Sequence, residues 1–106
     1  MPRSDREALP SALDDRVRFA IEHKRLIEVT YNGSVRVAEP HDYGMQRTLK
    51  LLVYQHRAAG GSFSGWRLLE VAKIEALTVL EETFRGSRGM SHARHMRWDV
   101  VFARVR

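Results

Sequence analysis

The dipeptide Asn32-Gly33 constrains the fold of this chain more than any other feature. It follows "LIEVTY" at 26–31, a run rich in β-branched and aromatic residues. Asn-Gly suits a type I′ turn, because both central residues of that turn need positive φ angles. The spacing therefore predicts a β-hairpin with a two-residue loop. Its facing pairs would be Tyr31 with Ser34, Val29 with Arg36 and Ile27 with Ala38.

In this register Arg36 shares a sheet face with Val29 and Tyr31. An arginine is rarely buried in such a place without an anion or a carboxylate, because the guanidinium group keeps its charge. Two interpretations stay open: Arg36 contacts an anionic ligand, or it pairs with an acid such as Glu39 or Glu70 and only stabilises the fold. A one-residue bulge in the hairpin would instead turn the side chain outward.

A helix is expected before the hairpin. Ser11 follows a proline and precedes Asp14 by three residues, which resembles a capping box with Asp in place of Glu or Gln. One apolar face follows at helical spacing, formed by Leu13, Val17, Ala20 and Ile21. The pattern predicts a helix over about 11–24.

Further strands are expected after the hairpin. The segments "TLKLLVYQH" at 48–56, "WRLLEV" and "IEALTVL" complete a series of five, with a Gly- and Ser-rich loop at 57–65. Residues 68–84 also have high helix propensity, but their closely spaced Val and Ile favour strands. The expected fold class is mainly β with one N-terminal helix, arranged as a small barrel that the helix caps.

The C-terminal fifth of the chain carries the whole net charge of +5. Residues 1–84 are neutral overall, whereas 85–106 hold six arginines and a single acid. We therefore expect a lead-in at 1–10, a helix-and-barrel domain at 11–84 and a basic extension at 85–106. Such a patch can meet phosphates or an acidic partner, or it only keeps a small protein soluble. The candidate phosphate contacts are Arg85, Arg88, Arg94 and Arg97.

The extension is also too apolar to be a simple solubilising tail. Trp98, Val100 and Phe102 alternate as in an edge strand, although Val101 and Val105 at i, i+4 would suit a helix. An edge strand of this composition predicts docking on the barrel or on a second copy, as in a homodimer.

Several residues are of types that occur in catalytic or metal sites, but their spacing favours neither kind of site. Adjacent His41 and Asp42 would point to opposite faces of a strand, so we do not expect a catalytic dyad. We expect Asp42 to cap a turn and Tyr43 to pack. His92 and His95 have no third ligand. The absence of cysteine excludes disulfides and thiol catalysis. We predict no enzymatic activity, no metal and no cofactor.

The loop and the termini add two expectations. Phe63 lies in the glycine-rich loop "AAGGSFSG", where an exposed ring can stack on a base, although it can also fold back on the barrel. The sequence contains neither a signal-peptide pattern nor an apolar run long enough to span a membrane, which predicts a cytoplasmic protein.

Residues 15–84 resemble the WYL domain family. An Ala-Ile pair ends the helix at Ala20-Ile21, a strand closes in Tyr31, and Arg36 is followed by Pro40. An apolar strand at 49–54, an arginine-bearing strand with Arg67, then Ile74 and Phe84 complete the match. The Trp-Tyr-Leu triplet of the family would fall at Leu49-Lys50-Leu51, where only the leucine matches. The usual winged helix-turn-helix ahead of the domain has no counterpart here.

The resemblance implies an Sm-like, SH3-type five-stranded barrel that senses a ligand and regulates transcription. For WYL domains this ligand is often proposed to be a nucleotide or single-stranded nucleic acid. Carried over by position, Arg36 and Arg67 would contact the anion, and Tyr31, His41 and Tyr43 would lie at the rim of the site. The resemblance also implies a separate helix-turn-helix partner.

Overall fold

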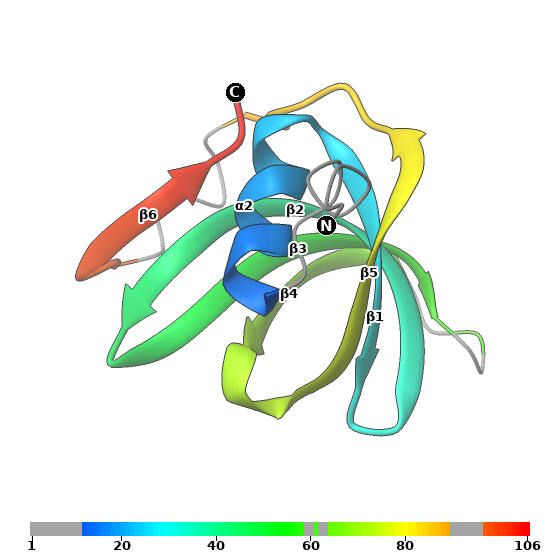
Figure 1. The fold of residues 1–106 in the computed structure, drawn as a ribbon, viewed down its shortest axis with the longest axis horizontal. Helices are drawn as coiled ribbons and strands as arrows, with labels where there is room; N and C mark the ends of the chain where they lie inside the picture. Colours follow the sequence, from blue (N-terminus) through cyan, green and yellow to red (C-terminus); the bar gives the residue numbers. More distant parts are fainter. Residues whose placement is uncertain (1–11, 59–60, 62–63, 90–96) are drawn as a thin grey trace, which may run out of the picture.

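The computed structural model describes residues 12–58, 61, 64–89 and 97–106. Expectations about the lead-in, Ser11, Phe63, His92, Arg94 and His95 lie outside these residues. The described elements, drawn in Figure 1, are α2 (Leu13–Glu22), β1 (Arg25–Tyr31), β2 (Ser34–Gln46), β3 (Thr48–Ala58), β4 (Gly65–Glu70), the short 3-10 helix η1 (Val71–Lys73), β5 (Ile74–Thr83) and β6 (Val100–Arg104).

The predicted hairpin is confirmed. Asn32 and Gly33 have φ angles of 53° and 73°, as a type I′ turn requires. The facing pairs are the expected ones: Tyr31 with Ser34, Val29 with Arg36 and Ile27 with Ala38. Residues 68–84 form strands around η1, so the alternative helix there is wrong.

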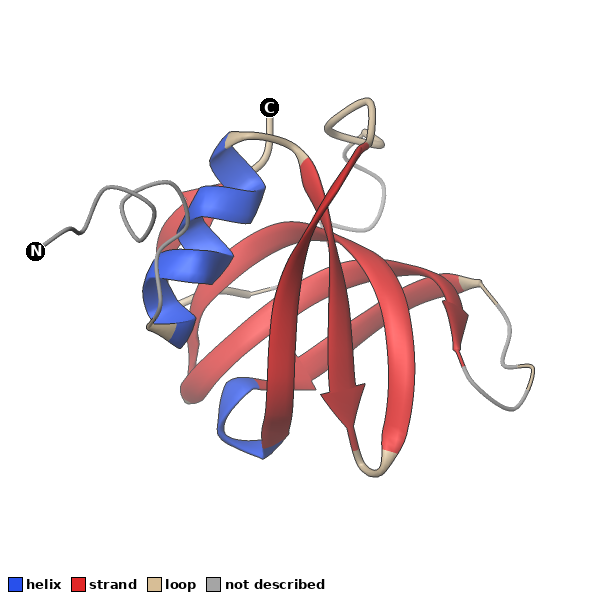
Figure 2. Cartoon of the chain, turned by 45° about the vertical axis from the view of Figure 1, so that its right-hand side comes forward, coloured by secondary structure: helices blue, strands red, loops and turns tan. Residues whose placement is uncertain are grey.

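The strands form one six-stranded antiparallel sheet (Figure 2). Its order is β4-β3-β2-β1-β5, and β6 also pairs with β2. The long strand β2 pairs with β3 along one edge, and with β1 and then β6 along the other. Over the described residues β4 and β5 are the two ends of the path, so the sheet is not closed. The mainly β class with one helix is confirmed.

The hydrophobic core lies on one face of this sheet, which we call the inner face. The apolar side of α2, formed by Val17, Ala20 and Ile21, is buried against it. The spacing of these residues is the one that predicted the helix. The sheet contributes core residues from every strand of the path, including Ile27 and Val29 of β1, Ala38 and Tyr43 of β2, Leu51 and Val53 of β3, Leu69 of β4, and Leu77 and Val79 of β5.

The C-terminal extension belongs to the same sheet, because β6 forms the edge strand that the alternation predicted. The amide of Val105 donates to the carbonyl of His41 at 2.8 Å, and Val105 is buried in the core. Gly44 lies so close to β6 that a Cβ there would collide with the Val100 carbonyl oxygen. The 84–89 segment is tied to the same end, since the Ser87 amide donates to the Arg106 carbonyl at 3.0 Å.

Candidate functional site

Arg36 lies on the inner face, as the hairpin register predicted. Its Nη1 donates to Gln55 Oε1 at 3.1 Å, and its guanidinium carbon lies 5.4 Å from the centre of the Tyr31 ring. Within the described residues, its buried Nε has no hydrogen-bond partner and no carboxylate forms an ion pair with the group. The alternative interpretation, in which an acid such as Glu39 or Glu70 pairs with Arg36, is therefore not observed within the described residues.

Arg67 reaches the same face from β4. It faces Val53 of β3, which is a core residue, and facing residues of an antiparallel pair point to the same side. Its Nη1 donates to the carbonyl of Trp66 at 2.8 Å. Strand β3 lies between the two arginines and contributes Gln55, which is 1% exposed and already contacts Arg36. The inner face thus carries Arg36, Arg67 and the buried amide of Gln55, which contacts Arg36.

The three predicted rim residues lie in different surroundings. Tyr31 is close to the arginine site: its ring faces Arg36, and its hydroxyl accepts the Glu70 amide at 3.0 Å. Tyr43 is 1% exposed, and its hydroxyl donates to Asp14 of α2 at 2.6 Å. Burial and that bond to a carboxylate raise the pKa of Tyr43, so the side chain stays a neutral donor. Tyr43 therefore joins the helix to the sheet, away from the rim position that we expected.

His41 and Asp42 also differ from expectation, because a β-bulge at His41 breaks the alternation of β2. His41 is 2% exposed, and its Nε2 lies 3.0 Å from Glu39 Oε1. Asp42 caps no turn: it accepts two hydrogen bonds from Arg104 of β6, at 3.0 and 3.3 Å. Both residues therefore make structural contacts at the junction of β2 with the C-terminal extension.

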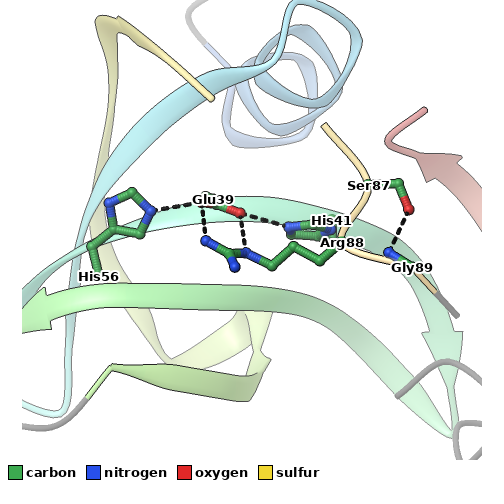
Figure 3. A network of polar contacts seen from close by, with 6 residues as sticks. All are labelled: Glu39, His41, His56, Ser87, Arg88 and Gly89. Atoms are coloured by element: carbon green, nitrogen blue, oxygen red, sulfur yellow. Dashed lines mark hydrogen bonds and ion pairs between the residues drawn. The ribbon is translucent and has the colours of Figure 1, made fainter. Parts of the chain in front are cut away.

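A polar network lies on the outer face of the sheet, with Glu39 at its centre (Figure 3). Arg88 of the 84–89 segment donates two hydrogen bonds to the Glu39 carboxylate, at 2.9 and 2.8 Å. The Nε2 atom of His56 in β3 lies 2.7 Å from Glu39 Oε2. The guanidinium carbon of Arg88 also lies 3.7 Å from the centre of the Tyr54 ring. This network holds the C-terminal segment on the sheet through one buried acid.

The electrostatics of this network favour a charged Glu39 and a neutral His41. Burial alone would raise the pKa of Glu39, but hydrogen bonds from Arg88, His56 and His41 outweigh it and hold the pKa at about 2. Burial lowers the pKa of His41, although the Glu39 carboxylate opposes this shift. Both oxygens of the Glu39 carboxylate thus have hydrogen-bond partners within the chain.

The predicted basic patch is only partly exposed to a ligand. Arg88 donates two hydrogen bonds to Glu39, so its charge is balanced within the chain, and its expected role as a phosphate contact stays a prediction. Arg85 is exposed and lines a cavity of about 280 Å³ beside Glu39. Arg97 is also exposed, and its carbonyl accepts the Gln46 side-chain amide at 3.3 Å. The arginines of the basic extension therefore do not form one continuous patch of unpaired charges among the described residues.

Sequence reasoning missed Gln55, His56 and the centre of the outer network. One signal was present, because Glu39 and His41 at i, i+2 share a strand face. In the part of the chain that the structure describes, no group of three or more His, Cys, Asp or Glu side chains is arranged to hold a metal ion. None of its helices is long and apolar enough to cross a membrane.

Comparison with known proteins gives no further guide to this site. No family model matches the chain, and neither a curated protein nor a solved structure is significantly similar to it.

Proposed function

We propose that this chain is a regulatory module without enzymatic activity, whose inner face binds an anionic ligand, a nucleotide or single-stranded nucleic acid. Arg36 carries the anion contact, Arg67 contributes from β4, and Tyr31 forms one wall. The proposal follows the resemblance to WYL domains and places the module in the cytoplasm, in transcriptional regulation.

One observation supports this proposal above all others: Arg36 carries a charge that no carboxylate of the described residues balances. A guanidinium group cannot shed its proton, so its partial burial beside Tyr31 costs free energy unless an anion joins it. Its planar fork carries five N–H donors, and Gln55 accepts from one of its terminal nitrogens. A phosphate or carboxylate of a ligand would complete the site.

The fold that we propose with this function is an Sm-like, SH3-type barrel. The order β4-β3-β2-β1-β5, the helix ahead of β1 and the short η1 between β4 and β5 are in keeping with it. The hydroxyl of Tyr31 also bridges part of the gap between the sheet ends, because it accepts the Glu70 amide of β4.

Arg36→Gln tests the proposal by removing the charge. We expect a labelled deoxythymidine strand to bind the wild type with an affinity that falls as salt is raised. Arg36→Gln should weaken this binding about ten-fold or more, since a hydrogen bond to a charged group contributes roughly 1.5–3 kcal/mol. Fluorescence anisotropy measures both effects.

Arg57→Gln is the matched control, because Arg57 is an exposed arginine on β3. It should change binding less than two-fold, as expected for a solvated side chain outside the site. Equal affinity of the wild type and Arg36→Gln would refute the ligand assignment. A parallel screen with phosphatase and nuclease substrates should show no turnover; measurable turnover would contradict the non-enzymatic part of the proposal.

The alternative function is a protein-interaction or homodimerisation module that works with a separate helix-turn-helix partner. Strand β6 favours it: it pairs only with β2 among the described strands, and its Val100, Val101 and Phe102 are 48%, 38% and 41% exposed. An edge strand with exposed apolar side chains is a ready surface for a second copy. Light scattering at high micromolar concentration should show a dimer that Val101→Glu dissociates, and a monomeric wild type would exclude the homodimer form of this alternative.

A further inference from the structure

A second cavity lies between α2 and the C-terminal strand, which run alongside each other in Figure 1. Its volume is about 580 Å³, within the range of small-molecule sites. It shares no lining residue with the inner-face site. We call it the α2–β6 groove.

Four basic side chains line this groove, and the only acid among its lining residues is Glu22. Arg18 and Arg104 are already fixed by carboxylates, Asp14 at 3.0 Å and Asp42 at 3.0 Å respectively. The other two, Lys24 and Arg106, form no ion pair with any residue of the described ranges. They are the cations that remain available to an incoming anion.

An aromatic ring completes the wall on the β6 side. Phe102 is 41% exposed, and it is held by the Tyr43 ring at 6.0 Å and by the guanidinium of Arg18, whose carbon lies 5.3 Å from the centre of the Phe102 ring. Ile21 and Ala103 add apolar surface beside it. The α2–β6 groove is therefore lined both by the ring of Phe102 and by two unpaired cations, Lys24 and Arg106.

We propose that the α2–β6 groove binds a small organic phosphate that carries an aromatic ring, of the kind represented by nucleoside monophosphates. The ring stacks on Phe102 and the guanidinium plane of Arg18, because aromatic faces and guanidinium groups both favour stacking with flat rings. The phosphate meets Lys24 and Arg106, whose charges are unpaired. This site is independent of the proposed function of the inner face.

The groove is matched to a small ligand rather than to duplex nucleic acid. Its cations lie on both walls, Lys24 next to the end of α2 and Arg106 just beyond β6, so one phosphate between the walls can meet both. The backbone behind them is fixed, because the Phe84 amide donates to the Lys24 carbonyl and the Ser87 amide to the Arg106 carbonyl, each at 3.0 Å. A rigid frame lowers the entropy lost when a ligand binds.

Calorimetric titration with AMP, adenosine and inorganic phosphate tests the two halves of the site. AMP should bind about ten-fold or more tightly than either fragment, since stacking on one aromatic side chain contributes roughly 1–3 kcal/mol. Phe102→Ala should weaken AMP binding about ten-fold by removing the ring. The double change Lys24→Gln/Arg106→Gln should weaken AMP binding to a similar extent and leave adenosine binding unchanged.

Two controls separate this site from the inner face and from general loss of structure. Arg36→Gln should leave AMP binding in the groove unchanged, whatever happens to ligands of the inner face. Phe102→Leu keeps an apolar side chain on β6 but loses the ring, so it should bind AMP as weakly as Phe102→Ala while showing wild-type circular dichroism. The proposal is overturned if AMP does not bind, if the groove variants bind it as tightly as the wild type, or if only Arg36→Gln abolishes binding.

Discussion

The two faces of the sheet around β2 and β3 hold an arginine in opposite ways. On the outer face, Arg88 donates two hydrogen bonds to Glu39, a carboxylate that is 4% exposed and also contacts His41 and His56. On the inner face, Arg36 contacts the neutral amide of Gln55 and the aromatic ring of Tyr31. Its Nε is buried without a hydrogen-bond partner in the described residues.

Under the proposed function, this difference distinguishes a charge that stabilises the fold from a charge that a ligand would meet. A buried charge that is fully paired by residues of the same chain needs no ligand. Removing one of these residues leaves the remaining buried groups uncompensated. A charge held without a counter-ion lowers stability, and proteins keep such strain where a ligand relieves it. We therefore expect Glu39 and Arg88 to stabilise the fold, whereas the proposed function assigns an anion contact to Arg36.

The largest effect is expected on the outer face. Glu39→Ala should lower the free energy of unfolding by about 3 kcal/mol, because it leaves Arg88, His41 and His56 without their shared acceptor. Arg88 is 41% exposed and can turn toward solvent, which limits the loss. Urea denaturation monitored by circular dichroism measures the change.

Glu39→Gln is the matched control for this variant. It keeps the shape of the side chain and one acceptor oxygen, so it should cost less than Glu39→Ala. If Glu39→Ala were as stable as the wild type, the outer network would not hold the C-terminal segment and the contrast between the faces would fail.

An acid titration should show the next largest effect. The pKa of Glu39 falls from its ordinary 4.5 to about 2 in the fold, so its contribution to stability is present above pH 4.5 and is lost as the pH falls from about 4.5 to about 2. This loss is at most about 3 kcal/mol. Burial lowers the pKa of His41 below its ordinary 6.5, so the contribution of the neutral imidazole is present above pH 6.5 and declines as the pH falls below it.

Urea denaturation at a series of pH values distinguishes the two faces further. Glu39→Gln should show a smaller loss between about pH 4.5 and 2, because a lowered pKa of Asp14 also contributes to it. Arg36 variants should keep the full loss, since a guanidinium group does not titrate there. The same acid-induced loss in Glu39→Gln as in the wild type would show that other carboxylates cause it.

The inner face was more predictable from the sequence than the outer one, for a physical reason. The position of Arg36 follows from a local rule, because Asn32-Gly33 sets the register and the register sets the face. The outer network joins β2, β3 and the 84–89 segment, and its contacts span 17 and 49 residues along the chain. The bulge at His41, which no local pattern announces, puts Asp42 and Tyr43 on the faces opposite to those that strict alternation would give.

The smallest expected change in stability is also the one that best defines the inner face. Arg36→Met replaces an unpaired, partly buried charge by an apolar side chain of similar length. We expect a free energy of unfolding within about 1 kcal/mol of the wild type, and on the stable side of it, because the lost bond to Gln55 is offset by the removal of an uncompensated charge. Arg88→Met should instead destabilise the protein by about 2 kcal/mol, since it leaves Glu39 buried without its main partner.

A ligand should reverse the order of stability on the inner face. An anion that binds only the folded wild type raises its unfolding free energy with concentration, and Arg36→Met should not respond. Urea denaturation with and without a single-stranded oligonucleotide measures both proteins under the same conditions. If Arg36→Met lost 2 kcal/mol or more without ligand, the guanidinium group would be a structural partner like Arg88. Both arginines would then stabilise the fold, and the two faces would differ only in the geometry of their contacts. A guanidinium group whose charge is needed to stabilise the fold is not available to bind a ligand.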